Sequence, residues 1–299
     1  MPNHSPSNDQ LINQAWQGLK PLTKNSHKGQ NGKLLIIGGS RLFHAASKWS
    51  LDIASKLVDM VFYSSVPSNN QLLSRLQAQE LDRQLVTTAK SHFWQGIVVS
   101  RHHLAEYIME ADCVLIGPGM ERSHYTKRLV NRLLRRYPQQ KWVVDAGALQ
   151  MVDPQLLNQH CIITPHHQEI QLLAKKDQRF DPTHYQASTT CLLKGPIDQI
   201  FYQDQTHTVQ QIKISGGNPG MTKGGTGDVL AGLLAALYCR NDQLTSTVVA
   251  SQVNKSAGDT LYQQVGPHFN ASDLLNTIPQ VLWRLSQEKR KKSSKKIKA

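Results

Sequence analysis

Short apolar runs alternate with amphipathic segments along most of the 299-residue chain. The expected strands are Lys33–Ile37, Met60–Ser64, Gly96–Ser100, Cys113–Ile116, Trp142–Val144, Cys161–Thr164, Cys191–Leu193, Gln199–Tyr202 and Thr206–Ile214. Between them apolar residues recur at helical spacing, as at Leu129, Leu133 and Tyr137. This alternation predicts an α/β fold: a mainly parallel central sheet with helices on both faces. The last two strands are expected to form an antiparallel hairpin at one edge.

The expected strands end in small or chemically reactive residues. These residues are Ser40, Gly119, Asp145, His166 and Lys194. In a parallel sheet the strand ends share one edge, and ligands bind in the crevice outside it. We therefore expect these five positions, which are far apart in the sequence, to converge on one site.

The domain organisation is expected to be simple, with one domain and two tails. Residues 1–25 are polar and predict a lead with a short helix at most, and residues 26–286 predict a single domain. Late helices are expected at Asp228–Tyr238, Thr245–Gln264 and Ala271–Leu285. Residues 287–299 are predominantly basic and are expected to form a disordered tail.

The net charge of +13 raises the question of a nucleic-acid partner. Much of the excess is local, at Lys289, Arg290, Lys291, Lys292, Lys295, Lys296 and Lys298. A block of like charges is typical of a solvated tail, and no aromatic residues are interleaved with this one. We expect neither a specific nucleic-acid partner nor a membrane partner, since no run approaches the roughly 18 apolar residues of a membrane span.

Cysteines and histidines give little sign of metal or redox chemistry. Cys113, Cys161, Cys191 and Cys239 form no CxxC pair, which predicts buried thiols in a reducing compartment. Residues 102–103 and 166–167 are adjacent histidines, which point apart on a strand and rarely share an ion, so no protein-bound metal is expected. The N-terminus has no apolar signal core, and a soluble, cytoplasmic protein is expected.

The strongest local signal is the segment from Gly216 to Asp228, which reads GGNPGMTKGGTGD and leads into the apolar run Val229–Leu237. Glycines let the backbone approach a ligand, and the first turn of a helix offers free amides and partial positive charge. The candidate anion hole consists of Gly224, Gly225, Thr226 and Gly227. Such a hole suits a phosphoryl group, although the spacing is neither a Walker loop nor GxGxxG.

Asp228 has two interpretations. It is a candidate helix N-cap, and it is also a candidate general base beside the anion hole, where it would accept the proton of an attacking hydroxyl. The helix dipole is expected to keep its carboxyl ionised, which suits a base.

Two adjacent motifs, NPGM at 218–221 and GGTGDVLAG at 224–232, resemble the signature of the NAD(P)H-hydrate dehydratases, a family of ribokinase-like fold. Further motifs follow in the family's order. They are Ser26–Gly29 with Gly38–Ser40, Gly117–Gly119, Val143–Ala146, Thr164–Glu169, Leu193–Gly195 and Ala271–Leu274. The likeness covers about residues 26–285, nearly the whole chain.

The resemblance implies a lyase that repairs damaged nicotinamide cofactor. Such an enzyme phosphorylates the ring hydroxyl of the (S)-hydrate of NADH or NADPH from ADP or ATP, and phosphate then leaves. Hydroxide is a poor leaving group and phosphate a good one, which explains the need for the nucleotide. Mg²⁺ would bridge the nucleotide phosphates.

Roles carry over from the family by position. Asp228 resembles the catalytic acid/base. The positions expected to contact the hydrate are Ala46, Gly119, His166 and Asp228. The positions expected to bind the nucleotide are Lys194, Gly195, Pro196, Ile197, Asp198 and Gly227. Without the resemblance, Lys194 is typical of a solvated strand-end lysine and His166 of a turn histidine.

The chain departs from the family pattern at three places. Residues 45–47 read AAS instead of GAP, residues 145–149 read DAGAL instead of DADAL, and residues 166–169 read HHQE instead of HPGE. The changed positions are Ala45, Ser47, Gly147, His167 and Gln168. They lie near the expected substrate crevice, so they bear on substrate preference and catalytic rate.

Two other functions stay open at this point. A ribokinase-like kinase of a small vitamin-precursor alcohol would share the fold and the glycine loop, and a degenerate relative would bind nucleotide without catalysis. The resemblance also implies a homo-oligomer such as a tetramer. Some relatives carry a fused epimerase, which roughly 25 leading residues cannot hold, so a separate NAD(P)H-hydrate epimerase is the expected functional partner.

Overall fold

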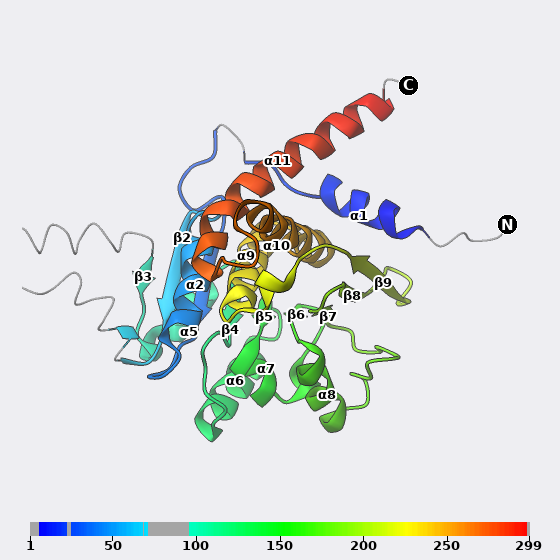
Figure 1. Ribbon diagram of the computed structural model, residues 1–299. Helices are drawn as coiled ribbons and strands as arrows, with labels where there is room; N and C mark the ends of the chain where they lie inside the picture. Colours follow the sequence, from blue (N-terminus) through cyan, green and yellow to red (C-terminus); the bar gives the residue numbers. More distant parts are fainter. Residues whose placement is uncertain (1–5, 23–24, 68, 71–95, 298–299) are drawn as a thin grey trace, which may run out of the picture.

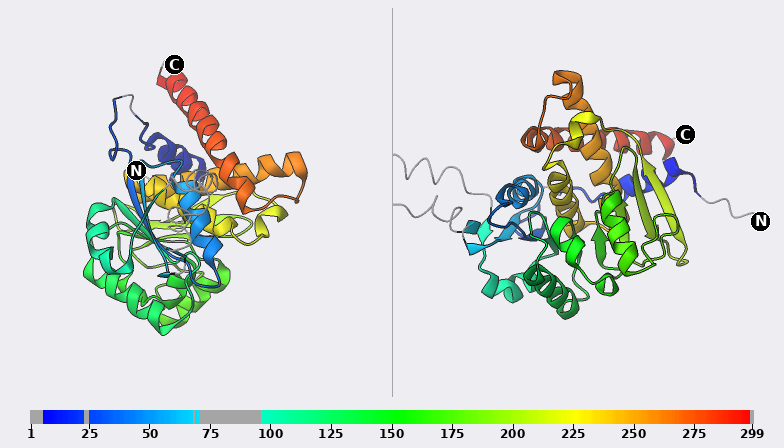
Figure 2. Two further views of the ribbon diagram at one scale, coloured as in Figure 1. Left: turned by 90° about the vertical axis from the view of Figure 1, so that its left-hand side faces the viewer. Right: turned by 60° about the horizontal axis from the view of Figure 1, so that its bottom comes forward.

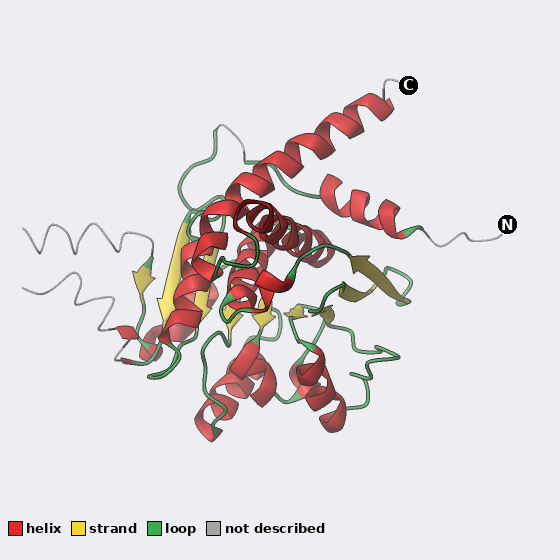
Figure 3. Ribbon diagram, viewed as in Figure 1, coloured by secondary structure: helices red, strands yellow, loops and turns green. Residues whose placement is uncertain are grey.

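The computed structural model describes residues 6–22, 25–67, 69–70 and 96–297. These residues form a nine-stranded sheet in the order β3-β2-β1-β4-β5-β6-β7-β8-β9. The strands are yellow in Figure 3. The strands are β1 (Lys33–Ile37), β2 (Met60–Ser64), β3 (Ile97–Val98), β4 (Cys113–Ile116), β5 (Trp142–Val144), β6 (Cys161–Ile163), β7 (Thr190–Leu193), β8 (Asp198–Gln203) and β9 (Val209–Ile214). Strands β1 to β7 are parallel, whereas β8 and β9 form an antiparallel hairpin at the edge, as predicted.

Helices cover both faces of the sheet (Figure 1). They are α1 (Asn8–Gln17), α2 (His44–Ala54), α5 (Leu104–Glu110), α6 (His124–Arg136), α7 (Ala146–Met151), α8 (His167–Lys176), α9 (Thr226–Arg240), α10 (Gln243–Val265) and α11 (Ala271–Ile297). Short 3₁₀ turns occur at Arg101–His103, Pro154–Leu156 and Pro219–Thr222. Helices α1, α2, α9, α10 and α11 pack on one face, and α5 to α8 on the other. The predicted α/β architecture is confirmed.

The apolar runs are continuous because both faces of the sheet are buried. In β1, Leu34 and Ile36 join the core cluster on one face, while Leu35 and Ile37 join the cluster on the other. All four side chains are fully buried. The same two-sided burial holds the strand ends in register, which positions the loops that follow them.

The polar lead contributes more to the fold than its composition indicated. Helix α1 begins at a capping box between Ser7 and Gln10, and its apolar side, which includes Leu11 and Trp16, is buried in the core. Trp16 Nε1 donates to Gln252 Oε1 in α10 at 2.5 Å. The residue boundaries predicted for the lead and the domain stay predictions.

The basic C-terminal segment was expected to be disordered, but α11 extends through it to Ile297. Lysine and arginine are good helix formers, and no glycine or proline follows Pro279, so the helix begun by the apolar residues continues. Lys289 Nζ donates to Asn13 Oδ1 at 2.8 Å, which fastens this part of α11 to α1 (Figure 2).

Local turn chemistry shifts some element ends from their predicted places. Strand β9 begins at Val209 because Thr206 lies in a turn, where its amide donates to Asp204 Oδ1 at 2.8 Å. All four cysteines are buried and free, as predicted. Within the described residues, no helix combines the length and apolar character needed to cross a membrane.

Candidate active site

The loops after β1, β4, β5, β6 and β7 meet at one edge of the sheet, as the strand order requires. The Gly39 amide donates to the Pro118 carbonyl at 2.7 Å, which joins the loops after β1 and β4. His166 and Lys194 form an isolated parallel bridge that extends β6 and β7. The predicted convergence of the strand ends is therefore confirmed.

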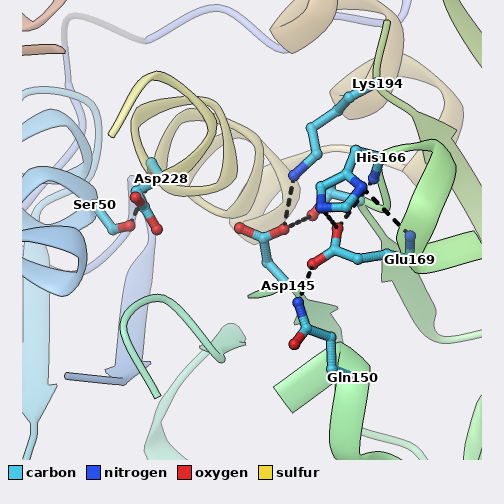
Figure 4. A network of polar contacts seen from close by, with 8 residues as sticks. Ser50, Asp145, Gln150, His166, Glu169, Lys194 and Asp228 are labelled. Atoms are coloured by element: carbon cyan, nitrogen blue, oxygen red, sulfur yellow. Dashed lines mark hydrogen bonds and ion pairs between the residues drawn. The ribbon is translucent and has the colours of Figure 1, made fainter. Parts of the chain in front are cut away.

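A buried polar network occupies the centre of this edge (Figure 4). Asp145 is 1% exposed, and its Oδ1 accepts from Thr164 Oγ1 at 2.7 Å and from Lys194 Nζ at 3.0 Å. Burial opposes the charge on Lys194, but the carboxylates of Asp145, Glu169 and Asp228 outweigh it and raise the pKa of this ammonium. Lys194 is therefore the partly buried ion-pair partner of a buried carboxylate rather than the solvated strand-end lysine of the alternative interpretation.

His166 is the N-cap of α8 and forms a capping box with Glu169. The Glu169 amide donates to His166 Nδ1 at 3.3 Å, and the His166 amide donates to Glu169 Oε2 at 3.0 Å. Gln150 Nε2 donates to the other Glu169 oxygen at 2.8 Å. The His166 ring is 48% exposed, so it caps the helix and still presents a face to the cleft.

The glycine loop forms a 3₁₀ turn and then enters α9. Gly225 is the N-cap with φ of +95°, a left-handed conformation that favours glycine. A Cβ there would lie 2.3 Å from the Trp49 ring, so the close packing also requires glycine. Thr226 Oγ1 donates to the carbonyls of Met221 at 2.8 Å and Lys223 at 3.0 Å, which fixes the loop. Gly224 has open space where a side chain would be.

Asp228 lies in the first turn of α9, at its third residue. Helix α9 begins two residues earlier than predicted, and Gly225 rather than Asp228 is the N-cap, so the capping interpretation of this aspartate is wrong. Ser50 Oγ in α2 donates to the Asp228 carbonyl at 2.7 Å (Figure 4), which holds the turn against α2.

The charge state of Asp228 differs from the sequence-based expectation. Burial, with a further contribution from the Asp145 carboxylate, raises the pKa of the Asp228 carboxyl to about 7 from its ordinary 3.8. Lys194 lowers this pKa but does not offset the burial. The prediction that the helix dipole keeps the group fully ionised is therefore wrong, because desolvation outweighs it. A carboxyl that titrates near neutrality is well suited to general acid/base work.

A pocket of about 690 Å³ lies beside the N-terminus of α9. Its lining residues are His166, Lys194, Gly195, Pro196, Asp198, Gly216, Gly217, Asn218, Pro219, Met221, Thr222, Thr226, Gly227, Leu230, Asn254 and Lys255. Most positions predicted to bind nucleotide are among them. Ile197 is not, and its side chain is 49% exposed.

The remaining predicted residues lie on the α2 side of Asp228. A Cβ at Gly119, whose φ is +69°, would lie 3.1 Å from the Ala46 Cβ and 2.3 Å from the Phe43 carbonyl oxygen. Only glycine fits this approach. Ala46 is four residues before Ser50, which bonds the turn carrying Asp228. Asp228 is not itself among the lining residues, but it follows the lining residue Gly227, and its carbonyl is bonded to α2, the helix that carries Ala46.

Two departures from the family pattern have structural explanations. A Cβ at Gly147 would lie 2.0 Å from the Met120 carbonyl oxygen, so the acid usual at this position does not fit here. Ser47 is fully buried and shares a 2.7 Å hydrogen bond with the Tyr63 hydroxyl. Nothing in the structure explains the changes at Ala45, His167 and Gln168.

Neither histidine pair lies on a strand, which the prediction had assumed. Residues 102–103 are part of a 3₁₀ turn, and residues 166 and 167 are the N-cap and the first residue of α8. In the part of the chain that the structure describes, no three His, Cys, Asp or Glu side chains gather into a metal site.

Sequence reasoning missed two residues of α10. Asn254 and Lys255 line the pocket and are 5% and 6% exposed. Asn254 Oδ1 is buried and has no hydrogen-bond partner among the described residues. The available signal was the row of Ser251, Lys255 and Asp259 at four-residue spacing in a predicted helix.

This fold and site define a ribokinase-like α/β protein. A crystal structure of the ADP/ATP-dependent NAD(P)H-hydrate dehydratase from Bacillus subtilis, co-crystallised with ATP/Mg²⁺, matches with a TM-score of 0.67 and 18% identity, covering 94% of this chain and 97% of that one. This match supports the fold. Residues 34–280 match the NAD(P)H-hydrate dehydratase family, and the chain belongs to it.

Curated relatives agree with this assignment. The bifunctional NAD(P)H-hydrate repair enzyme of Methanocaldococcus jannaschii is 35% identical over 277 residues, covering 89% of this chain and 52% of that protein. The ADP-dependent (S)-NAD(P)H-hydrate dehydratase of Cenarchaeum symbiosum is 31% identical over 276 residues, covering 87% of this chain and 91% of that protein. The chain spans about half the length of the bifunctional relatives it matches. The predicted family is confirmed.

Proposed function

We propose that this protein is a lyase that converts the (S)-hydrate of NADH or NADPH back to the reduced cofactor, using ADP or ATP. The observation that carries the proposal is the position of Asp228, a carboxyl with a pKa of about 7 that directly follows the pocket-lining Gly227 in a turn bonded to α2, the helix of Ala46. Family membership and the names of the archaeal relatives support the same reaction.

In the proposed mechanism Asp228 accepts the proton of the hydrate hydroxyl as that oxygen attacks the terminal phosphorus of the nucleotide. The new O–P bond replaces the bond to the nucleotide, which leaves as AMP or ADP. The ring nitrogen then supplies an electron pair, the C–O bond breaks, and phosphate departs. Loss of a proton from the adjacent ring carbon restores the dihydronicotinamide.

The glycine loop has the role of holding the transferring phosphoryl group. The Thr226 amide already donates to the Lys223 carbonyl at 3.4 Å, so the role is assigned to the amide of the pocket-lining Gly227, together with the partial positive charge of the start of α9. Lys194 and the following segment to Asp198 are assigned to the nucleotide. The hydrate is assigned to Ala46, Gly119 and the exposed face of His166.

In this proposal Mg²⁺ is bound mainly by the nucleotide phosphates rather than by a set of protein ligands. Mg²⁺ commonly binds through substrate phosphates and one or two carboxylates. One oxygen of Asp145, Oδ1, is already engaged by Thr164 and Lys194. The ion would supply charge neutralisation on the phosphates.

The decisive assay gives purified protein chemically prepared hydrate, Mg²⁺, and either ADP or ATP. Return of the near-ultraviolet absorbance of the dihydronicotinamide is expected with the (S)-hydrate, and loss of that signal is expected in Asp228→Asn. Parallel reactions with the hydrates of NADH and NADPH show which of the two substrates the protein prefers. No turnover with either nucleotide would remove the proposal.

The same preparation tests the two alternatives. Phosphorylation of hydroxyethylthiazole or hydroxymethylpyrimidine in place of hydrate turnover would support a vitamin-precursor kinase. Nucleotide binding without turnover of any of these substrates would support a non-catalytic relative. A homo-oligomer, a cytoplasmic location and a functional link to a separate NAD(P)H-hydrate epimerase are further parts of the proposal, and size-exclusion chromatography with light scattering tests the first.

A further inference from the structure

One face of α10 holds the backbone segments that line the pocket. Ser251, Lys255 and Asp259 are spaced by four residues, so they lie in a row along this face. Ser251 Oγ donates to Asp198 Oδ2 at 2.7 Å. The Asp259 carboxylate accepts from the Gly217 amide at 3.1 Å. Lys255 lies between these two anchors in the row.

The Lys255 ammonium is surrounded by four oxygen atoms. Its Nζ donates to the carbonyls of Gly195 at 2.9 Å, Pro196 at 3.1 Å and Gly216 at 3.1 Å. Asp198 Oδ1 lies 3.3 Å away and supplies the countercharge. An ammonium has three protons, so the three carbonyls use all of them.

These contacts join two segments just beyond the end of the β8–β9 ladder. Residues 195–197 connect β7 to Asp198, the first residue of β8, and Gly216 comes two residues after Ile214, the partner of Asp198 in β9. Lys255 is 6% exposed and Asp198 is 4% exposed, so the pair has little contact with water. Lysine is rarely buried unless it is paired, because its desolvation is costly. A set of carbonyl oxygens around a buried cation is also how proteins replace the hydration shell of a monovalent ion.

We propose that Lys255 is a positioning residue whose ammonium acts as a tethered monovalent cation, locking the segment of Gly195–Asp198 to Gly216 and so fixing the shape of the nucleotide side of the pocket. It acts through these segments rather than on the reacting atoms. The identity of the ligand rests on the proposed function, whereas the locking of the two segments does not.

The first test is Lys255→Met, which keeps a side chain of similar length and removes its positive charge. In sodium buffer the KM for ADP or ATP is expected to rise by about tenfold or more, with the KM for the hydrate within about twofold. Ammonium chloride is expected to recover about fivefold or more of the lost kcat/KM at constant ionic strength, because a small cation can enter the vacated oxygen cage. Tetramethylammonium, which is too large, is expected to have no effect. Lys213→Met, at an exposed lysine of β9, is the matched control.

The second test addresses folding, since Lys255→Met leaves the buried Asp198 carboxylate without its cation. Lys255→Met combined with Asp198→Asn removes both charges and is expected to fold. Amide hydrogen exchange at Gly216 and Gly217 is expected to be about tenfold faster than in the wild type without nucleotide. This readout requires neither substrate.

A folded Lys255 variant with wild-type nucleotide KM and wild-type exchange at these amides would overturn the inference. Faster exchange and weaker nucleotide use without recovery by ammonium would overturn the tethered-cation part of it. A wild-type protein that fails to turn over hydrate would instead remove the proposed function, and the exchange comparison would still decide the role of Lys255.

Discussion

Replacing Asp228 by asparagine is expected to stabilise the folded protein, and the gain is expected to grow with pH. The folded carboxyl has a pKa of about 7, against an ordinary value of 3.8. The folded state therefore binds this proton more tightly than the unfolded state does. The associated stability is fully present below pH 3.8 and is lost as pH rises through 7.

The size of the effect follows from these two values. Linkage gives a loss of about 2–3 kcal/mol of wild-type stability between pH 5 and pH 8 from this group alone. An asparagine does not ionise, so the variant avoids that loss. The free energy of unfolding of Asp228→Asn minus that of the wild type is therefore expected to be about 2–3 kcal/mol larger at pH 8 than at pH 5.

Urea unfolding of both proteins without nucleotide, at the two pH values, measures this difference directly. Glu121→Gln is the control, because Glu121 is exposed and its carboxylate carries no burial cost. A stability difference for Asp228→Asn that is equal at pH 5 and pH 8 would refute burial as the cause of the raised pKa. A more stable but inactive variant would show that the carboxyl is kept at a cost to folding.

Three further outcomes are expected. The kcat/KM for hydrate should rise with pH through about 7 and then level off, and Asp228→Asn should lower it by about 100-fold or more in initial-rate measurements; a flat profile would contradict the role of this base. Lys194→Met should lower the free energy of unfolding in urea by about 3–5 kcal/mol, because the buried Asp145 carboxylate loses its cation. The same variant should raise the pKa of Asp228 seen in the pH dependence of kcat/KM, and an unchanged pH dependence would exclude an interaction between Lys194 and Asp228. Gly225→Ala should lower the free energy of unfolding by about 2 kcal/mol or more, because residue 225 has positive φ and a Cβ would clash with an indole ring. Gly224→Ala, with open space around it, should change this free energy by no more than about 0.5 kcal/mol, and equal effects of the two variants would contradict the described packing of the loop.

The architecture could be predicted because it depends on local patterns. Buried strands such as Lys33–Ile37 are apolar at every position once both faces of the sheet are covered, and the strand ends share one edge in any parallel sheet. The convergence of Asp145, His166 and Lys194 followed from that rule alone. The glycine loop was also readable, since positive φ and close packing restrict Gly225 to glycine.

What could not be predicted depends on contacts between distant residues. The Lys255 cage joins carbonyls that are up to 60 positions away in the sequence, and backbone carbonyls leave no trace in a sequence pattern. The pKa of Asp228 depends on how much water the folded site excludes, which the helix dipole argument ignored. The helical continuation of the basic tail was missed because charge was weighed above helix propensity.

The contact between Gly147 and the Met120 carbonyl constrains how this site can vary among related sequences. An acid at residue 147 requires the turn that carries Met120 to retreat by about 1 Å or more, since a Cβ alone would lie 2.0 Å from that oxygen. Substitutions at residue 147 and in the turn that carries Met120 are therefore expected to occur together. Relatives with glycine at this position should share the tight turn, and those with an acid should have a looser one, so the two groups should offer the hydrate differently shaped walls.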